Sequence, residues 1–127
     1  MRRDSPWAKY TRITRDILKQ MPLIMPSRTS YNQNFLSQWC GNDTESLHIV
    51  ATYNLIYNAV FLVDTGIGNA LCLENLVDTS PGSNLCFCPL EPPSFETPVL
   101  IWKKGKTLSK ASTVFLEEIK RELSGIP

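Results

Sequence analysis

Residues 49–73 constrain the fold more than any other stretch, because a long apolar run lies there between two short ones. The long run, residues 55–63, is apolar on nearly every side of a helix, which predicts a buried helix. The short runs at residues 49–51 and 70–73 have the length and composition of buried strands. We therefore predict two parallel strands joined by a buried helix.

Two glycines, Gly66 and Gly68, mark the end of this helix and the turn into the next strand. Glycine adopts positive φ without steric cost, which suits the residue that ends a helix. At Gly68 the missing side chain lets the backbone turn closely into residues 70–73. We expect both glycines to shape the backbone and not to bind phosphate.

The chain before residue 49 predicts a short helix, a strand and a second helix. Thr14 is suited to cap a helix that ends near Gln20, and Pro22 prevents its continuation. Residues 23–25 predict a brief buried strand. The spacing of Ser30 and Gln33 fits a capping box, which predicts a helix from residue 31.

The chain after residue 73 predicts two strands and a last helix. Residues 85–88 alternate like a strand, and residues 99–102 are a second strand candidate. Ser109 is suited to cap the last helix, and Gly125 ends its pattern. Its apolar residues recur at helical spacing: Ala111, Val114, Phe115, Ile119 and Leu123. The alternation of strands and helices predicts the α/β class, with a small, mostly parallel sheet flanked by helices.

Composition places the chain among globular proteins and argues against nucleic acid as a direct partner. The 127 residues are enough for one domain, here expected over residues 1–127, and the formal net charge is +1. No apolar stretch approaches the length of a membrane span, so we expect a soluble, cytoplasmic protein with no membrane partner. The irregular spacing of four cysteines predicts reduced thiols: Cys40, Cys72, Cys86 and Cys88.

A small-molecule site is predicted where polar residues follow two of the strands. In a parallel sheet, ligands gather beyond the carboxyl ends of the strands, where helix N-termini present free amides. Hydroxyl, amide and guanidinium groups at both ends could hold a small anion such as a carboxylate. The alternative is that the hydroxyl and amide residues cap helices and that the cation is solvated. The candidate residues are Ser27, Arg28, Thr29, Ser30, Thr52, Tyr53 and Asn54.

The sequence offers little for catalysis or metal binding. His48 is the only histidine, and no cysteine has an evident partner for it in the sequence, so a structural histidine is favoured. Cys86 and Cys88 lack a second pair at metal-ligand spacing. We therefore expect no enzyme activity, no metal and no cofactor.

Four passages, in this order, resemble the effector-sensing domain of LysR-type transcriptional regulators. MRRDSPWAKYTRIT resembles the family's hinge strand and helix start, and PLIMPSR resembles the strand that follows. FLVDTGIGNALCL resembles the signature V-x-x-G-x-G-[IY]-A-L, and WKKGKTLSKASTVFLEEI resembles the family's closing segment. The resemblance spans nearly the whole chain.

The resemblance implies one lobe of a fold like the type 2 periplasmic binding proteins, in which two lobes close around a small effector. It also implies that the winged helix-turn-helix, the linker helix and the first effector subdomain of a full-length member are absent here. We therefore expect a truncated product that binds no operator alone, binds effectors weakly and is a homo-oligomer. Asn69, Glu74 and Asn75 depart from the family pattern, and we expect them to alter the pocket.

A different class of function remains open. The lobe face, with Trp102 and the last helix, could drive self-association, so the chain would be an interaction module without ligand binding of its own. A stable dimer without ligand would favour this alternative.

Overall fold

The computed structural model describes residues 1–27, 39–41, 43, 45–95 and 99–124. The chain divides into two compact units, Met1–Glu96 and Thr97–Pro127. Among the described residues, the strands all lie in the first unit, and the second unit holds a single helix.

Strand β2 (Leu23–Pro26) is the centre of the first unit. It pairs in parallel with β3 (Ile49–Tyr53) on one side and with β4 (Asn69–Ala70) on the other, which gives the strand order β3-β2-β4. Its apolar residues are all buried, as expected for a central strand of a parallel sheet. The predicted strand at residues 49–51 is confirmed within β3, whereas the strand predicted at residues 70–73 is β4 at Asn69–Ala70 and does not extend over residues 71–73. The two strands are parallel to β2 and flank it, so they do not pair with each other.

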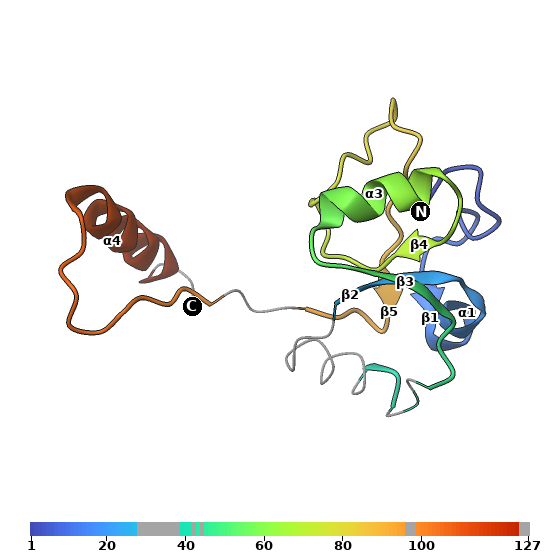
Figure 1. Ribbon diagram of the computed structural model, residues 1–127, viewed down its shortest axis with the longest axis horizontal. Coiled ribbons are helices and arrows are strands. Elements are labelled where there is room, and N and C mark those ends of the chain that lie inside the picture. Colours follow the sequence, from blue (N-terminus) through green and yellow to red (C-terminus); the bar gives the residue numbers. More distant parts are fainter. Residues whose placement is uncertain (28–38, 42, 44, 96–98, 125–127) are drawn as a thin grey trace. The chain divides into compact units, whose positions relative to one another are not determined.

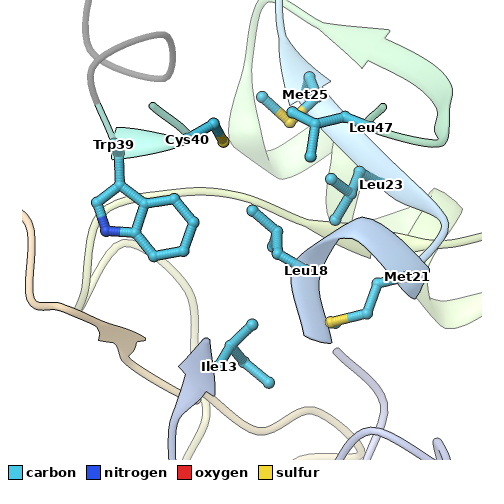
Figure 2. Close-up of a cluster of buried hydrophobic side chains, with 8 residues drawn as sticks. All are labelled: Ile13, Leu18, Met21, Leu23, Met25, Trp39, Cys40 and Leu47. Carbon is cyan, nitrogen blue, oxygen red and sulfur yellow. The ribbon is translucent and has the colours of Figure 1, made fainter. Parts of the chain in front are cut away.

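Successive side chains of β2 enter two different hydrophobic clusters. Ile24 packs with Ala59 and Val63 of α3 (Ile56–Asp64), whereas Leu23 and Met25 face the cluster that includes α1 (Arg15–Gln20). Because side chains alternate along a strand, α1 and α3 cover opposite faces of the sheet, as Figure 1 also shows. Figure 2 shows the α1 cluster, formed by Ile13, Leu18, Met21, Leu23, Met25, Trp39, Cys40 and Leu47.

Helix α3 is buried along one face only, so the prediction of burial on nearly every side is wrong. Ala59 and Val63 are buried, while Tyr57 and Phe61 are 66% and 71% exposed. A helix lying on a sheet is covered on the side that faces the sheet, and no second layer of the first unit's described residues covers its outer side.

The two glycines after α3 behave as predicted. Gly66, which follows the C-cap Thr65, has a φ of 81°. At Gly68, a Cβ atom would lie 2.9 Å from Val50 Cγ2 and 3.0 Å from the Pro22 carbonyl oxygen. Only a residue without a side chain fits this approach to β2 and β3 without displacing neighbours.

A second, smaller parallel sheet pairs β1 (Ile13–Thr14) with β5 (Leu90–Glu91). The Thr14 side chain also caps α1 by accepting a hydrogen bond from the Ile17 amide, as predicted. The strand predicted at residues 85–88 is wrong, because the pairing with β1 falls at Leu90–Glu91. Leu85 forms only an isolated antiparallel bridge with Arg2.

The second unit consists of a coil and helix α4 (Lys110–Ser124), which Ser109 caps as predicted by accepting a hydrogen bond from the Ser112 amide. No residue of α4 is buried. The strand predicted at residues 99–102 is wrong: these residues are exposed coil, because the described part of this unit contains no strand for them to pair with.

Two further expectations have different outcomes. The helix predicted from residue 31 lies mostly outside the described residues.

The four cysteines are free thiols, and Cys40 is buried in the α1 cluster, in agreement with the prediction of reduced cysteines. Among the residues that the structure describes, no helix is both long and apolar enough to cross a membrane.

Candidate functional site

The carboxyl ends of β2 and β3 lie side by side at one edge of the sheet. Pro26 is opposite Tyr53 in the parallel register, and the Ser27 amide donates a 2.6 Å hydrogen bond to the Tyr53 carbonyl oxygen. The structure therefore brings Ser27 next to Tyr53 and its predicted neighbours Thr52 and Asn54. Because this pairing extends β3 to Tyr53, Thr52 and Tyr53 belong to the strand and do not follow it.

Thr52 and Asn54 do not cap the helix that follows them. The N-cap of α3 is Leu55, which has an extended backbone and no side-chain capping hydrogen bond. The first turn of α3 contains no acidic residue. The alternative interpretation of Thr52 or Asn54 as caps of this helix is therefore wrong, and both residues are exposed.

Tyr53 is tied into the fold more firmly than its neighbours. Its hydroxyl donates a 2.7 Å hydrogen bond to the carbonyl oxygen of Leu71, just beyond β4, and its ring packs against the α3 cluster. Burial, with a smaller contribution from Cys72, raises the pKa of Tyr53 to about 12. Tyr53 is thus neutral at physiological pH, and its proton is already engaged.

Arg28, Thr29 and Ser30 lie outside the described residues. Their part in the site stays a prediction. The described portion of the candidate site consists of Ser27, Thr52, Tyr53 and Asn54, together with the backbone amides at the start of α3.

The described residues show no arrangement suited to nucleophilic catalysis. Burial raises the pKa of the thiols of Cys40, Cys72 and Cys88, whereas a reactive cysteine needs a lowered pKa. His48 is exposed, just before β3, and its carbonyl oxygen accepts a hydrogen bond from the Leu23 amide. Within the described ranges, no three histidine, cysteine, aspartate or glutamate side chains gather as metal ligands.

The arrangement of parallel strands, crossover helix and polar strand ends fits the family whose sequence model matches this chain. That family model, the LysR substrate binding domain, matches residues 1–124. The chain belongs to the LysR substrate-binding domain family. Domains of this family are the effector-binding part of LysR regulators and have an α/β fold like that of periplasmic binding proteins. Searches of curated proteins and of solved structures returned no match.

Asn69, the most buried departure from the LysR pattern, has a structural role. Its side-chain amide donates a 3.1 Å hydrogen bond to the Pro22 carbonyl oxygen, and its own backbone amide donates to the same oxygen at 2.8 Å. Asn69 is opposite Leu23, at the amino ends of the strands. The expectation that Asn69 shapes the pocket therefore does not fit its position, which is at the other edge of the sheet from the candidate site.

The sequence analysis did not predict that the first turn of α3 lacks a side-chain cap. Leu55 lies inside the apolar run, so the run alone did not separate the N-cap from the helix. The available signal was the lack of a serine, threonine, aspartate or asparagine directly before Ile56, which leaves the first amides without a local side-chain acceptor.

Proposed function

We propose that this chain is the effector-sensing part of a LysR-type transcriptional regulator and that it binds a small anionic molecule at the carboxyl ends of β2 and β3. The observation that carries this proposal is the family match over residues 1–124. The anionic character and the position of the site rest on the geometry of the strand ends.

The start of α3 favours an anion. The first amides of a helix lack intrahelical acceptors, and the aligned peptide dipoles add a partial positive charge at that end. Since Leu55 provides no side-chain acceptor and the first turn carries no carboxylate, a ligand oxygen can accept hydrogen bonds from these amides.

The polar residues divide into two roles in this proposal. Thr52 and Asn54 are exposed at the carboxyl end of β3 and would donate hydrogen bonds to the ligand, together with Ser27, which directly follows β2. Tyr53 would hold the strand end in place through its bond to Leu71. Arg28, Thr29 and Ser30 are the proposed source of a cation and further hydroxyls.

The proposed role is binding and not catalysis, with no cofactor. Residues 1–127 would form one lobe of a two-lobed, cytoplasmic sensor, and closure of the lobes around the effector would be transmitted to transcription. An operator contact by this chain is not proposed, because its net charge of +1 provides little attraction for phosphates.

The test is an NMR titration of the chain with acetate and benzoate. We expect the amide signals of Thr52, Asn54, Ile56 and Tyr57 to shift together, with weak, millimolar affinity. The variants Thr52→Ala and Asn54→Ala should weaken binding about three- to tenfold each, the equivalent of one hydrogen bond.

Matched controls are Thr65→Ala and Asn58→Ala. Thr65 lies at the opposite end of α3, where its hydroxyl donates to the Leu62 carbonyl oxygen, and Asn58 is exposed within the helix. Both variants should bind like the unmodified chain. Shifts that fall elsewhere on the protein, or an equal loss of affinity in all four variants, would contradict the proposed site.

A further inference from the structure

We propose that the thiols of Cys86 and Cys88 together bind one soft, monovalent metal ion of the Cu(I) class. This inference uses none of the candidate effector residues and does not depend on the proposed function. It begins from the short stretch of chain before β5, in which these two cysteines are separated by one residue.

Backbone hydrogen bonds hold this stretch at two points. At one end, the Cys86 amide donates a 2.9 Å hydrogen bond to the Met1 carbonyl oxygen. At the other end, the Ile13 amide donates a 2.9 Å hydrogen bond to the carbonyl oxygen of Pro89, directly before β5. Cys88 lies between these two points, so both cysteines are carried by backbone that is fixed in place.

Exposure alternates along this stretch as it does along a strand. Cys86, Cys88 and Leu90 are half-buried, whereas Phe87 and Pro89 are exposed. In an extended chain, residues two positions apart project to the same face and lie about 6.6 Å apart, at 3.3 Å per residue. The two thiols therefore occupy neighbouring positions on the inward face.

Both thiols lie against the backbone of residues 1–10. The Cys88 Sγ donates a 3.1 Å hydrogen bond to the Tyr10 carbonyl oxygen, and the Cys86 Sγ lies 3.9 Å from the Arg2 carbonyl oxygen. Burial raises the pKa of the Cys88 thiol, and the nearby Cys86 raises it further. Because a thiol is a weak hydrogen-bond donor, metal–sulfur bonds readily replace these two contacts.

The number of available ligands selects the class of ion. Structural zinc takes four protein ligands, and the described part of the chain contains no group of three histidine, cysteine, aspartate or glutamate side chains that could hold a metal. The lack of a second cysteine pair thus argues against zinc. A soft ion such as Cu(I) prefers thiolates, and two of them satisfy it in a linear arrangement. Hard cations such as Mg²⁺ and Ca²⁺ prefer oxygen ligands and should not bind here.

Binding exchanges protons for the ion without any change of oxidation state. Each thiol releases its proton to solvent and forms one sulfur–copper bond, and copper stays Cu(I) throughout. Because both side chains are half-buried and not enclosed, solvent can accept the protons and the ion can enter.

A competition titration of the reduced chain with Cu(I) tests the site. Copper is supplied anaerobically as its bicinchoninate complex, with ascorbate in place of a thiol reductant. We expect one Cu(I) to transfer to each chain, with a new sulfur-to-copper absorption in the ultraviolet. Cys86→Ala and Cys88→Ala should each lower the affinity by roughly a hundredfold or more, because only one thiolate remains.

Matched controls use the other two cysteines and the residue between the proposed ligands. Cys40→Ala and Cys72→Ala should still bind one Cu(I), with unchanged affinity. Phe87→Cys combined with Cys88→Ala keeps two thiols but places them on opposite faces, so it should bind no better than Cys88→Ala alone. Circular dichroism and urea unfolding should show that all these variants are folded.

Alkylation of the unmodified chain gives a second test that needs no variant. One equivalent of Cu(I) should slow the reaction of iodoacetamide with Cys86 and Cys88 by roughly tenfold or more, because a metal-bound thiolate is no longer a free nucleophile. Cys72 should react as in the metal-free chain. Mass spectrometry of the alkylated peptides measures each site separately.

Three results would overturn the proposal. The chain could take no Cu(I) from the bicinchoninate complex. It could bind Cu(I) with the same affinity in Cys86→Ala or Cys88→Ala, and without protection of either thiol from iodoacetamide. Cys72→Ala could also weaken binding as much as Cys88→Ala, which would mean that the ligands are not the pair proposed here.

Discussion

Strand β2 and helix α4 were both recognisable from apolar residues, but only β2 is buried. Leu23, Ile24 and Met25 are nearly inaccessible, whereas α4 contains no buried residue. The difference comes from the segments that adjoin each element in the sequence. Parallel strands are joined by crossover segments that pack over the faces of the sheet, so the strands become buried. Helix α4 follows exposed coil, and the described part of its own unit contains no strand to pack against it.

The largest expected effect is at the centre of β2. Ile24 is 0% exposed and packs against Ala59 and Val63 of α3. Replacing it in Ile24→Ala removes buried methyl groups and leaves a cavity, which should lower the free energy of unfolding by about 2–5 kcal/mol. Urea unfolding followed by tryptophan fluorescence measures this loss.

The matched control is Leu123→Ala in α4. Leu123 is 60% exposed, so its loss should change the free energy of unfolding by no more than about 0.5 kcal/mol. Similar losses in the two variants would mean that α4 is buried as β2 is, and the contrast between the two regions would be wrong.

The next effect tests how closely the chain after α3 approaches β2. Gly68→Ala would introduce a Cβ atom within 3.1 Å of Ile24 Cγ1 and still closer to Val50 and Pro22. The resulting overpacking should destabilise the protein by about 1–3 kcal/mol. Thermal unfolding followed by circular dichroism measures it.

Gly82→Ala provides the comparison at a glycine with open surroundings. A Cβ atom at Gly82 would meet no atom within 4 Å. This variant should be neutral or more stable by up to about 1 kcal/mol, because alanine restricts the unfolded chain. Equal destabilisation by the two variants would show that Gly68 has no special packing constraint.

A smaller effect is expected for the hydroxyl of Tyr53. Tyr53→Phe removes the hydrogen bond to the Leu71 carbonyl oxygen and should cost about 0.5–1.5 kcal/mol at neutral pH. Tyr57→Phe is the control, because Tyr57 is 66% exposed and its hydroxyl should contribute little. Equal stability of the two variants would mean that the Tyr53 hydroxyl does not hold the strand end.

The same variant has a signature at high pH. The pKa of Tyr53 is raised to about 12 in the folded protein, against about 10 in an unfolded chain. Between these values the unfolded state binds fewer protons than the folded state, so stability falls as pH rises. The contribution of Tyr53 is complete below pH 10 and is lost through pH 12. Tyr53→Phe should flatten this part of the stability curve.

The local features of the first unit could be predicted from sequence because they depend on short-range chemistry. Thr14 as a cap, the end of α1 near Gln20 and the positive φ of Gly66 each follow from a few neighbouring residues. Strand β2 was also predictable, since a short apolar run between two prolines has few other solutions.

The long-range features could not be predicted in the same way. The position of β5 at Leu90–Glu91 depends on its register with β1, which the alternation of residues 85–88 does not reveal. The length of β3, and with it the place of Thr52 and Tyr53, depends on pairing with Met25 and Pro26. The candidate site at these two strand ends therefore stays a prediction: the structure shows that the strand ends are adjacent, and Arg28, Thr29 and Ser30 lie outside the described residues.

The smallest effect on global stability is expected at the cap of α4. This variant tests whether α4 unfolds independently of the first unit. Ser109→Ala removes the acceptor of the Ser112 amide, 3.2 Å away, and should weaken the first turn of α4 by about 1 kcal/mol. Amide hydrogen exchange should report this as roughly fivefold lower protection in α4. Urea unfolding of the first unit should not change, because α4 buries no residue.

Thr14→Ala removes the equivalent cap of α1, where the Thr14 hydroxyl accepts from the Ile17 amide. Since α1 carries the buried Leu18 into the core, loss of this cap should lower the global free energy of unfolding by about 1 kcal/mol. The same chemical change would thus be global in one helix and local in the other. A shift of the global transition by Ser109→Ala as large as that by Thr14→Ala would show that α4 unfolds together with the sheet, because some surface then covers the face that is exposed in α4.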